Sequence, residues 1–252
     1  MCDTCGCGDP ELVPVDVHED ILAGNRHRAE HNREHFRARG VFTVNLMGSP
    51  GAGKTAVLEA TARYHPDARC GALAGDLATD NDASRLNAAG IPSLSITTGS
   101  ACHLDAKMVH EALHAFPSWP DLDYLFVENV GNLVCPAVYD LGQDVNVVAL
   151  SITEGEDKPI KYPVMFRNAD LVLLTKMDLL PHLRHVSVAN VLAAIAQVMP
   201  ANKVILFSAE SGLGVANWLA WLATRRAAQV GTRHHGDHGH GNEHHDHEHH
   251  HV

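Results

Sequence analysis

The sequence predicts an α/β fold in which a mostly parallel sheet is covered by helices on both faces. Short apolar runs alternate with stretches of helical length from residue 41 to residue 228. The run 171–174 is apolar at every position, as expected of a strand that is buried on both faces. The first apolar run ends at a glycine-rich loop that leads into a helical pattern. Together these observations favour a parallel sheet with crossover helices.

The segments that flank this alternation have a different composition. Residues 1–17 show no helical or strand period, and we expect a flexible, cysteine-rich arm. Residues 18–40 are rich in Arg, His and Glu, which predicts a polar leading helix that ends at Gly40. Residues 229–252 interleave His with Gly, Asp, Glu and Asn. Such a tail has little to bury and is expected to be disordered without a ligand.

The domain between these flanks, residues 41–228, carries the alternating pattern. The expected strands are 41–47, 70–74, 93–97, 124–128, 145–151, 170–175 and 203–208. The expected helices are 54–64, 80–89, 104–115, 181–198 and 214–227.

Composition limits the class of protein. The chain has 252 residues, is 45% hydrophobic and carries a formal net charge of −11. So acidic a chain is a poor candidate for nucleic-acid binding. No apolar run reaches the roughly 18–20 residues that span a bilayer, and the N-terminus lacks the pattern of a signal peptide. We therefore expect a cytoplasmic protein with free thiols and neither a membrane nor a nucleic-acid partner.

A phosphate-binding loop follows the first strand. Residues 48–55 read Gly-Ser-Pro-Gly-Ala-Gly-Lys-Thr and satisfy the pattern G-x-x-x-x-G-K-[ST] between a strand and a helix. We expect Lys54 to reach the β- and γ-phosphates and the Thr55 hydroxyl to bind Mg²⁺. The sequence thus predicts a P-loop nucleotide hydrolase. The candidate phosphate-binding residues are Gly48, Gly51, Ala52, Gly53, Lys54 and Thr55.

A second motif indicates the base. Residues 175–178, Thr-Lys-Met-Asp, end an apolar strand and resemble the Asn-Lys-x-Asp guanine motif of GTPases. The Asp178 carboxylate can accept two hydrogen bonds from guanine, whereas adenine offers no such pair of donors. Lys176 can cover the base, and Ser208 and Ala209 resemble the loop that meets guanine O6. The alternative is a polar strand end without a ligand.

Two acidic residues end strands where switch elements are expected. Asp76 ends the second strand, and Glu128 begins Glu-Asn-Val-Gly, which resembles Asp-x-x-Gly. A carboxylate there can hold Mg²⁺ or its water. We assign Lys54, Asp76 and Glu128 to catalysis, and Thr55, Asp76 and Glu128 to Mg²⁺. The alternative for each acid is a helix cap or an ordinary loop carboxylate.

Three groups of Cys and His are candidate metal ligands. Cys2, Cys5 and Cys7 have a C-x-x-C-x-C spacing that suits Ni²⁺ or Zn²⁺, although a redox or incidental cluster is the alternative. Cys102, His103 and Cys135 follow strands and should lie at their carboxyl ends, near the nucleotide. Each could instead be a buried Cys or a satisfied His, and three ligands leave one position open or need a partner subunit.

The third group is the His-rich tail, a candidate store for borderline metals. Its alternation with other residues argues against a purification tag. The tail ligands are His234, His235, His238, His240, His244, His245, His247, His249, His250 and His251.

These motifs together resemble the HypB family of hydrogenase nickel-incorporation GTPases. The resemblance rests on the Cys-x-x-Cys-Gly-Cys start and on residues 45–55, 75–83, 128–136 and 154–163, and it covers about residues 1–227. It implies a SIMIBI-type GTPase fold, slow GTP hydrolysis, and a homodimer formed on GTP or metal binding. It also implies nickel delivery to a [NiFe] hydrogenase precursor, with a HypA-type accessory protein and the hydrogenase large subunit as partners.

The resemblance also assigns the metal sites. It implies a tight nickel site at Cys2, Cys5 and Cys7 and a GTPase-domain site, for nickel or zinc, at Cys102, His103 and Cys135. Similar chains with a His tail store nickel. The ligands alone do not distinguish nickel from zinc, so nickel comes from the resemblance.

The sequence departs from the family pattern at two positions. Thr175 replaces Asn in the guanine motif, and Ser49 stands where some relatives carry a signature lysine. Another cation must then neutralise the γ-phosphate, and we expect Lys158 or Lys161 to do so, in trans across a dimer.

A mechanism follows from these positions. GTP and Mg²⁺ order residues 128–136, Cys135 moves with them, and metal affinity becomes linked to the nucleotide state. One alternative is a urease-type nickel GTPase, which lacks the Cys-rich arm. The other is a nickel storage protein with a weak or vestigial nucleotide site, against which Lys54, Thr55 and Asp178 argue.

Overall fold

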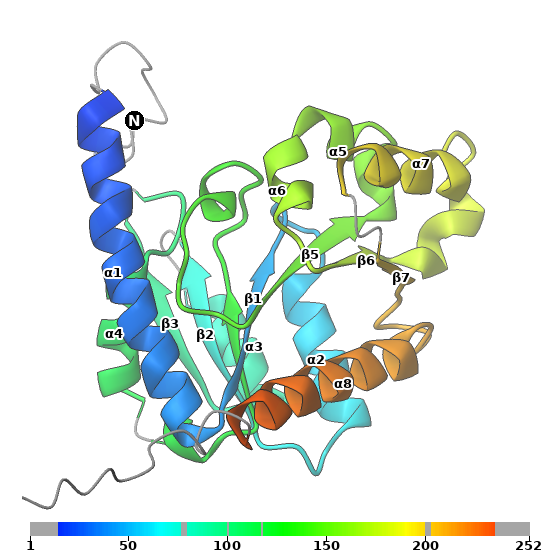
Figure 1. The fold of residues 1–252 in the computed structure, drawn as a ribbon. Helices are drawn as coiled ribbons and strands as arrows, with labels where there is room; N and C mark the ends of the chain where they lie inside the picture. Colours follow the sequence, from blue (N-terminus) through cyan, green and yellow to red (C-terminus); the bar gives the residue numbers. More distant parts are fainter. Residues whose placement is uncertain (1–14, 77–79, 100, 117, 200–202, 235–252) are drawn as a thin grey trace, which may run out of the picture.

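The computed structural model describes residues 15–76, 80–99, 101–116, 118–199 and 203–234, and the side chains of 22–229 within these ranges. A seven-stranded sheet forms the centre, in the order β3-β2-β4-β1-β5-β6-β7 (Figure 1). Every neighbouring pair is parallel. The strands are β1 Phe42–Met47, β2 Cys70–Asp76, β3 Ser93–Thr97, β4 Tyr124–Glu128, β5 Val145–Ser151, β6 Leu171–Thr175 and β7 Val204–Leu206.

The helices are α1 Val15–Arg39, α2 Lys54–Tyr64, α3 Asn81–Ala88, α4 Ala106–His114, α5 Lys158–Lys161, α6 Pro163–Arg167, α7 Val188–Val198 and α8 Val215–His234. Helix α1 precedes the first strand, α8 follows the last, and the other helices lie in the connections between strands. Among the described residues, no helix is long and apolar enough to cross a membrane.

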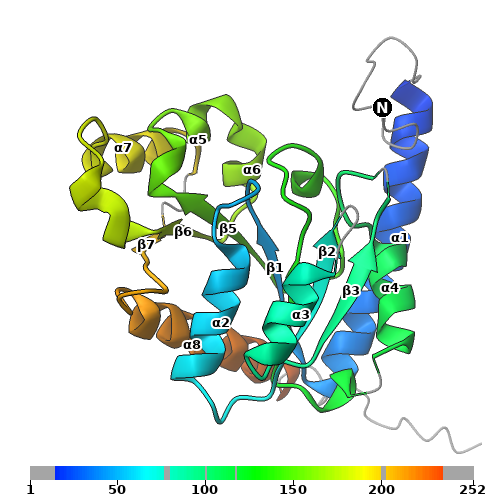
Figure 2. The same cartoon turned by 180° about the vertical axis from the view of Figure 1, so that it is seen from behind.

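Different helices cover the two faces of the sheet (Figures 1 and 2). On β4, Tyr124 and Phe126 face the core formed with α2, α3 and α8. Leu125 and Val127 face the opposite core, formed with α1 and α4. Helices α6 and α7 cover that second face over β5 and β6. Successive side chains of a strand point to opposite faces, and in β2, β4 and β6 nearly all of them are apolar and buried, which explains the continuous apolar runs of these strands.

The predicted fold class is confirmed, and the sheet is parallel throughout rather than mostly parallel. The helix expected over 181–198 is wrong at its start, because α7 begins at Val188. The preceding segment, Met177–His182, is a 3₁₀ helix that contains Pro181. A proline lacks the N–H that a continuing α-helix needs, so the chain turns before α7 begins.

The outer helices also differ from the expected boundaries. α1 begins at Val15, before the expected position 18, and ends at Arg39, before Gly40 with φ 72°. α8 continues to His234, beyond the expected helix end at 227. Gln229, in this last part, donates a hydrogen bond to the Asp144 carboxylate, which ties the helix end to the start of β5.

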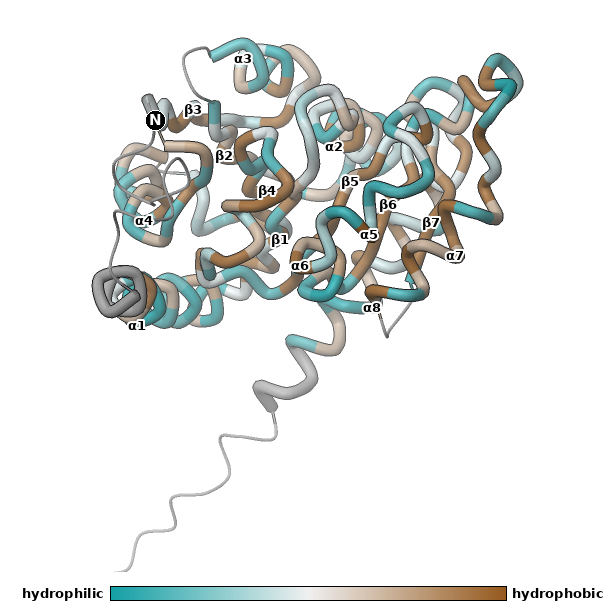
Figure 3. The backbone as a smooth tube through the Cα atoms, turned by 90° about the horizontal axis from the view of Figure 1, so that it is seen from above, coloured by the Kyte–Doolittle hydropathy of each residue, from teal (hydrophilic) through white to brown (hydrophobic). Residues whose placement is uncertain are grey.

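The carboxyl ends of the strands lie along one edge of the sheet. β1 and β4 are neighbours, and β2 lies beside β4. The loops that follow β1, β2, β4 and β6 therefore meet at this edge. Figure 3 views this edge from above and shows these loops around the start of α2.

Candidate functional site

The glycine-rich loop lies between β1 and α2. Gly48 has φ 149°, and a Cβ atom there would lie 2.3 Å from the Ala149 carbonyl oxygen. Gly53 precedes α2 in a left-handed conformation, with φ 93°. Lys54 is buried, and its Nζ lies 3.4 Å from the carbonyl oxygens of Gly48 and Ser49. The loop thus packs closely against β5 and brings one buried cation to the N-terminus of α2, an arrangement suited to phosphate.

A hydroxyl and two carboxylates meet beside this loop. The Thr55 hydroxyl lies 2.8 Å from Glu128 Oε1 and 3.0 Å from Asp82 Oδ1. Burial raises the pKa of Glu128 to about 7, although nearby Lys54 opposes the shift. Glu128 Oε2 is buried and has no hydrogen-bond partner among the described residues. A hydroxyl, two carboxylates and an unpartnered carboxylate oxygen fit a hard divalent cation such as Mg²⁺.

Asp82 was not among the candidate ligands, although it lies in the family-like stretch 75–83. The sequence feature that could have identified Asp82 as a ligand is its position in the first turn of α3, shortly after the end of β2. Asp76, the expected ligand, ends β2 and faces the same cavity. Its carbonyl oxygen accepts a hydrogen bond from the Thr98 N–H at 2.9 Å.

This cavity has a volume of about 530 Å³ and lies between the loop, Asp76, Glu128 and the segment after β4. Arg85 also lines it and forms ion pairs with Glu59 at 2.8 Å and Asp82 at 3.8 Å. The cavity therefore combines cations, acids and loop N–H groups. That chemistry suits a polyphosphate with a divalent cation.

A second cavity of about 190 Å³ adjoins the guanine-like motif. Lys176, Asp178 and Ala209 line it, and the Ser208 hydroxyl donates to Asp178 Oδ1 at 2.6 Å. Lys176 has φ 58° and is the only non-glycine residue with a positive φ in the described ranges. Such strain is typical of a backbone that is held for a ligand.

Thr175 has a clear structural role at the position where Asn is usual. Its hydroxyl is buried and donates to the Ala52 carbonyl oxygen at 2.6 Å, with the Leu150 carbonyl at 3.3 Å. The guanine-like motif is thus fastened directly to the phosphate loop. The Thr175 hydroxyl therefore makes the hydrogen bond that joins the end of β6 to the phosphate loop.

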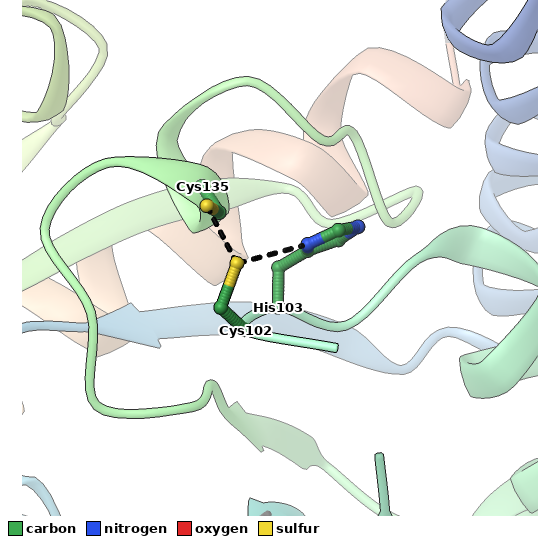
Figure 4. A group of neighbouring side chains, drawn as sticks. All are labelled: Cys102, His103 and Cys135. Carbon is green, nitrogen blue, oxygen red and sulfur yellow. Dashed lines mark hydrogen bonds between the residues drawn. The ribbon is translucent and has the colours of Figure 1, made fainter. Parts of the chain in front are cut away.

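Cys102, His103 and Cys135 lie together, as Figure 4 shows. Their ligand atoms are all within 4.8 Å of one another, close enough to hold one metal ion. The two sulfurs are 2.7 Å apart, neither cysteine is in a disulfide, and His103 Nδ1 lies 3.8 Å from Cys102 Sγ. Burial lowers the pKa of His103, whose ring stacks on Tyr139 with centroids 3.8 Å apart.

The segment after β4 connects this trio to the phosphate loop. Gly131 is so close to Pro50 that a Cβ atom would lie 2.9 Å from the proline, and Gly48 forms a β-bridge with Asn132. Asn129 accepts a hydrogen bond from the Leu104 N–H at 3.2 Å, next to His103. One short stretch of chain therefore contacts the phosphate loop at its start and contributes Cys135 at its end.

The two candidate lysines differ in their surroundings. Lys158 Nζ lies 4.0 Å from Glu154 Oε2, and Glu154 accepts a hydrogen bond from Ser49 in the phosphate loop. Lys161 instead pairs with Asp157 at 2.6 Å, where both side chains are exposed. Lys158 is thus the lysine that is connected to the phosphate loop.

Comparisons with known proteins agree with this geometry. A family model for the CobW/HypB/UreG nucleotide-binding domain matches residues 42–206. The hydrogenase maturation factor HypB of Escherichia coli K12 is 47% identical over 224 residues, which cover 88% of this chain and 76% of that protein. The chain belongs to the HypB family. The hydrogenase/urease maturation factor HypB of Helicobacter pylori is 36% identical over 231 residues, covering 90% of this chain and 95% of that protein.

Solved HypB structures share the fold. The crystal structure of HypB from Helicobacter pylori in complex with nickel has a TM-score of 0.78 and 36% identity, covering 81% of this chain and 96% of that one. HypB from Archaeoglobus fulgidus has a TM-score of 0.75 and 38% identity, covering 81% of this chain and all of that one (100%). This HypB family member is therefore a nucleotide-binding P-loop protein.

Two predicted metal-binding segments of this HypB family member lie outside the described residues. They are the arm with Cys2, Cys5 and Cys7, and the tail from His235 to His251; the side chain of His234 is not described either.

Proposed function

We propose that this protein is a metal-regulated GTPase and nickel metallochaperone. It hydrolyses GTP to insert nickel into a [NiFe] hydrogenase precursor, with a HypA-type accessory protein and the hydrogenase large subunit as partners. The observation that carries the proposal is the segment 128–136. It begins at Glu128, beside Thr55, and ends with Cys135, beside Cys102. A nucleotide-dependent change in this segment would reach the metal ligands directly.

Guanine selectivity is proposed for the smaller cavity. Asp178 accepts from the base, Lys176 covers it, and Ser208 holds the Asp178 carboxylate in place. The Thr175 bond to Ala52 fixes the distance between base and phosphate sites. A carboxylate with a fixed orientation discriminates well, because a base without the matching donors leaves it unpaired.

Phosphate binding and hydrolysis are proposed for the larger cavity. Lys54 contacts the β- and γ-phosphates, while Thr55, Asp82 and Glu128 hold Mg²⁺ directly or through water, with Asp76 in its shell. Mg²⁺ held by these residues would neutralise charge on the transferred phosphoryl group. Lys158 approaches the γ-phosphate of the partner protomer in a GTP-dependent homodimer, and it replaces the lysine that is absent at Ser49.

The cargo is held by Cys102, His103 and Cys135, with one position open for a ligand from a partner. Soft thiolates and an imidazole suit Ni²⁺ and Zn²⁺ alike, and the nickel complex of the Helicobacter pylori relative favours nickel. Tight nickel binding by Cys2, Cys5 and Cys7 and nickel storage by the His tail remain predictions, as does a cytoplasmic location.

A hydrolysis assay on the full chain tests this proposal. GTP and ATP turnover are measured without Ni²⁺ and with enough Ni²⁺ to saturate the arm, the tail and the trio, for the wild type, Cys135→Ser and Cys70→Ser. Cys70 is a matched control, because it is buried in β2 away from the trio. We expect turnover of GTP but not ATP, a nickel-dependent rate in the wild type and in Cys70→Ser, and a nickel-independent rate in Cys135→Ser. A vestigial nucleotide site would give no GTP turnover in any of them.

A further inference from the structure

Four histidines lie together on the surface formed by α1 and α4, which run side by side (Figures 1 and 2). We call them the imidazole cluster: His31 and His35 on α1, and His110 and His114 on α4. Each pair is separated by four residues and so lies on one face of its helix. The proposed nucleotide and Cys102 sites use none of these residues.

Within each helix, the distance between the two histidine nitrogens matches that between two ligands of one metal ion. His31 Nε2 and His35 Nε2 are 3.0 Å apart, and His110 Nε2 and His114 Nε2 are 3.2 Å apart. Two nitrogens that each lie about 2.1 Å from one ion are about 3.0 Å apart at a right angle and about 3.4 Å apart at a tetrahedral angle. Across the helices, the ring centroids of His31 and His110 are 5.1 Å apart.

A buried residue orients one of these ligands. Asn32 is fully buried, and its Nδ2 donates to the carbonyl oxygens of Ala106 and Leu141 at 2.8 Å and 3.1 Å. Its Oδ1 must then accept, so the contact at 3.1 Å is a hydrogen bond from His110 Nδ1–H. His110 Nε2 therefore carries the lone pair and faces the other imidazoles. Metal-binding histidines in proteins are typically oriented by such a second hydrogen bond.

We propose that the imidazole cluster binds a borderline divalent transition-metal ion such as Ni²⁺, Cu²⁺ or Zn²⁺. Nearby charges are mixed, with Glu34 and Arg39 near His35 and Arg28 near His110. The attraction therefore comes from nitrogen donors rather than from net negative charge, which selects against Mg²⁺ and Ca²⁺. The bound ion clamps α1 to α4. This site is independent of the proposed GTPase function.

Metal counting on the full chain tests the inference. Wild type, His31→Gln/His110→Gln and the matched control His65→Gln/His182→Gln are equilibrated with excess Ni²⁺, separated from free ion and analysed for bound nickel. The cluster variant is expected to bind about one equivalent less than the wild type, because each helix loses one ligand, while the control equals the wild type. Equal nickel content in the cluster variant and the wild type would overturn the proposal.

Crystals grown with Ni²⁺ provide a position-specific readout. We expect an anomalous peak between α1 and α4, about 2.1 Å from imidazole nitrogens. Its absence in crystals that show a peak at Cys102 would also overturn the proposal, and the histidines would then be joined by hydrogen bonds alone. GTP turnover of the metal-free protein should be the same in all three chains, so this test stands apart from that of the proposed function.

Discussion

At the scale of single residues, the phosphate cavity depends on buried charge. Glu128 is 2% exposed, and its Oε2 has no hydrogen-bond partner among the described residues. An unpartnered buried carboxylate oxygen is costly unless a cation or proton meets it. Lys54, whose pKa is lowered by burial, partly compensates the charge of Glu128. We therefore expect Glu128 to matter chiefly through the cation that it holds.

Glu128→Gln tests this role, because the amide keeps the shape of the side chain and removes the charge. The Mg²⁺ concentration needed for half-maximal GTP hydrolysis should rise by about 10–100-fold. Glu111→Gln is the control, since Glu111 forms an exposed ion pair with Lys107 on α4 and does not line this cavity. Initial rates at increasing Mg²⁺ concentrations give this requirement for both variants. An unchanged Mg²⁺ requirement in Glu128→Gln would show that Glu128 does not hold the cation.

Several functional residues could be predicted from the sequence because their motifs are local. In the stretches 48–55 and 175–178 the functional residues are close in sequence, so their spacing can be recognised directly. Asp82 could not be predicted in the same way, because its contact with Thr55 joins residues 27 positions apart. The role of Thr175 depends on the carbonyl of Ala52, which no local pattern reveals.

At the scale of elements, the short helix α5 carries the two candidate lysines. Lys158 lies near Glu154, which bonds Ser49 in the phosphate loop, whereas Lys161 pairs with Asp157 on the surface. Lys161 is thus a matched control for Lys158, because it lies one turn away on the same helix.

Lys158→Ala should reduce GTP-induced dimerisation and lower the GTP hydrolysis rate by at least about 10-fold, because a cation at the γ-phosphate is lost. Lys161→Ala should behave like the wild type. Light scattering with a GTP analogue and steady-state turnover measure the two effects. If both variants retain dimerisation and rate, neither lysine neutralises the phosphate.

Strands were easier to predict than helix ends. The inner strands β2, β4 and β6 are mostly apolar and buried on both faces, so their limits are visible in composition. The start of α7 depends on the path of the chain after β6, which includes a 3₁₀ helix with Pro181. Helices α5 and α6 are too short to show a helical period. These details depend on packing rather than on periodicity.

At the scale of the whole molecule, Asp123 ties the C-terminal helix to the sheet. It accepts from Arg69 NH2 at 2.9 Å, just before β2, and from Arg226 NH2 on α8 at 2.6 Å. The hydrogen bond from Arg69 is the main reason that the pKa of Asp123 falls to about 2. One carboxylate thereby joins the start of β2 to α8.

This contact predicts how stability depends on pH. Because the pKa of Asp123 is lower in the folded chain than the usual value near 3.9, its contribution is present above about pH 4 and is lost as pH falls toward 2. Asp123→Asn should lower the free energy of unfolding by about 1–2 kcal/mol at pH 7 and by about half as much at pH 3. Urea unfolding at both pH values measures this, and an equal loss at both would contradict it.

We infer that one segment, residues 128–136, links nucleotide state to metal binding across the molecule. The measurement that tests it most directly is titration of Ni²⁺ into the full chain bound to Mg·GDP and to a Mg·GTP analogue, with Cys102→Ser/Cys135→Ser subtracted to isolate the trio. We predict that the trio binds nickel with affinities that differ by about 5–150-fold between the two nucleotide states, as expected of a coupling of 1–3 kcal/mol. Equal affinities would contradict the account.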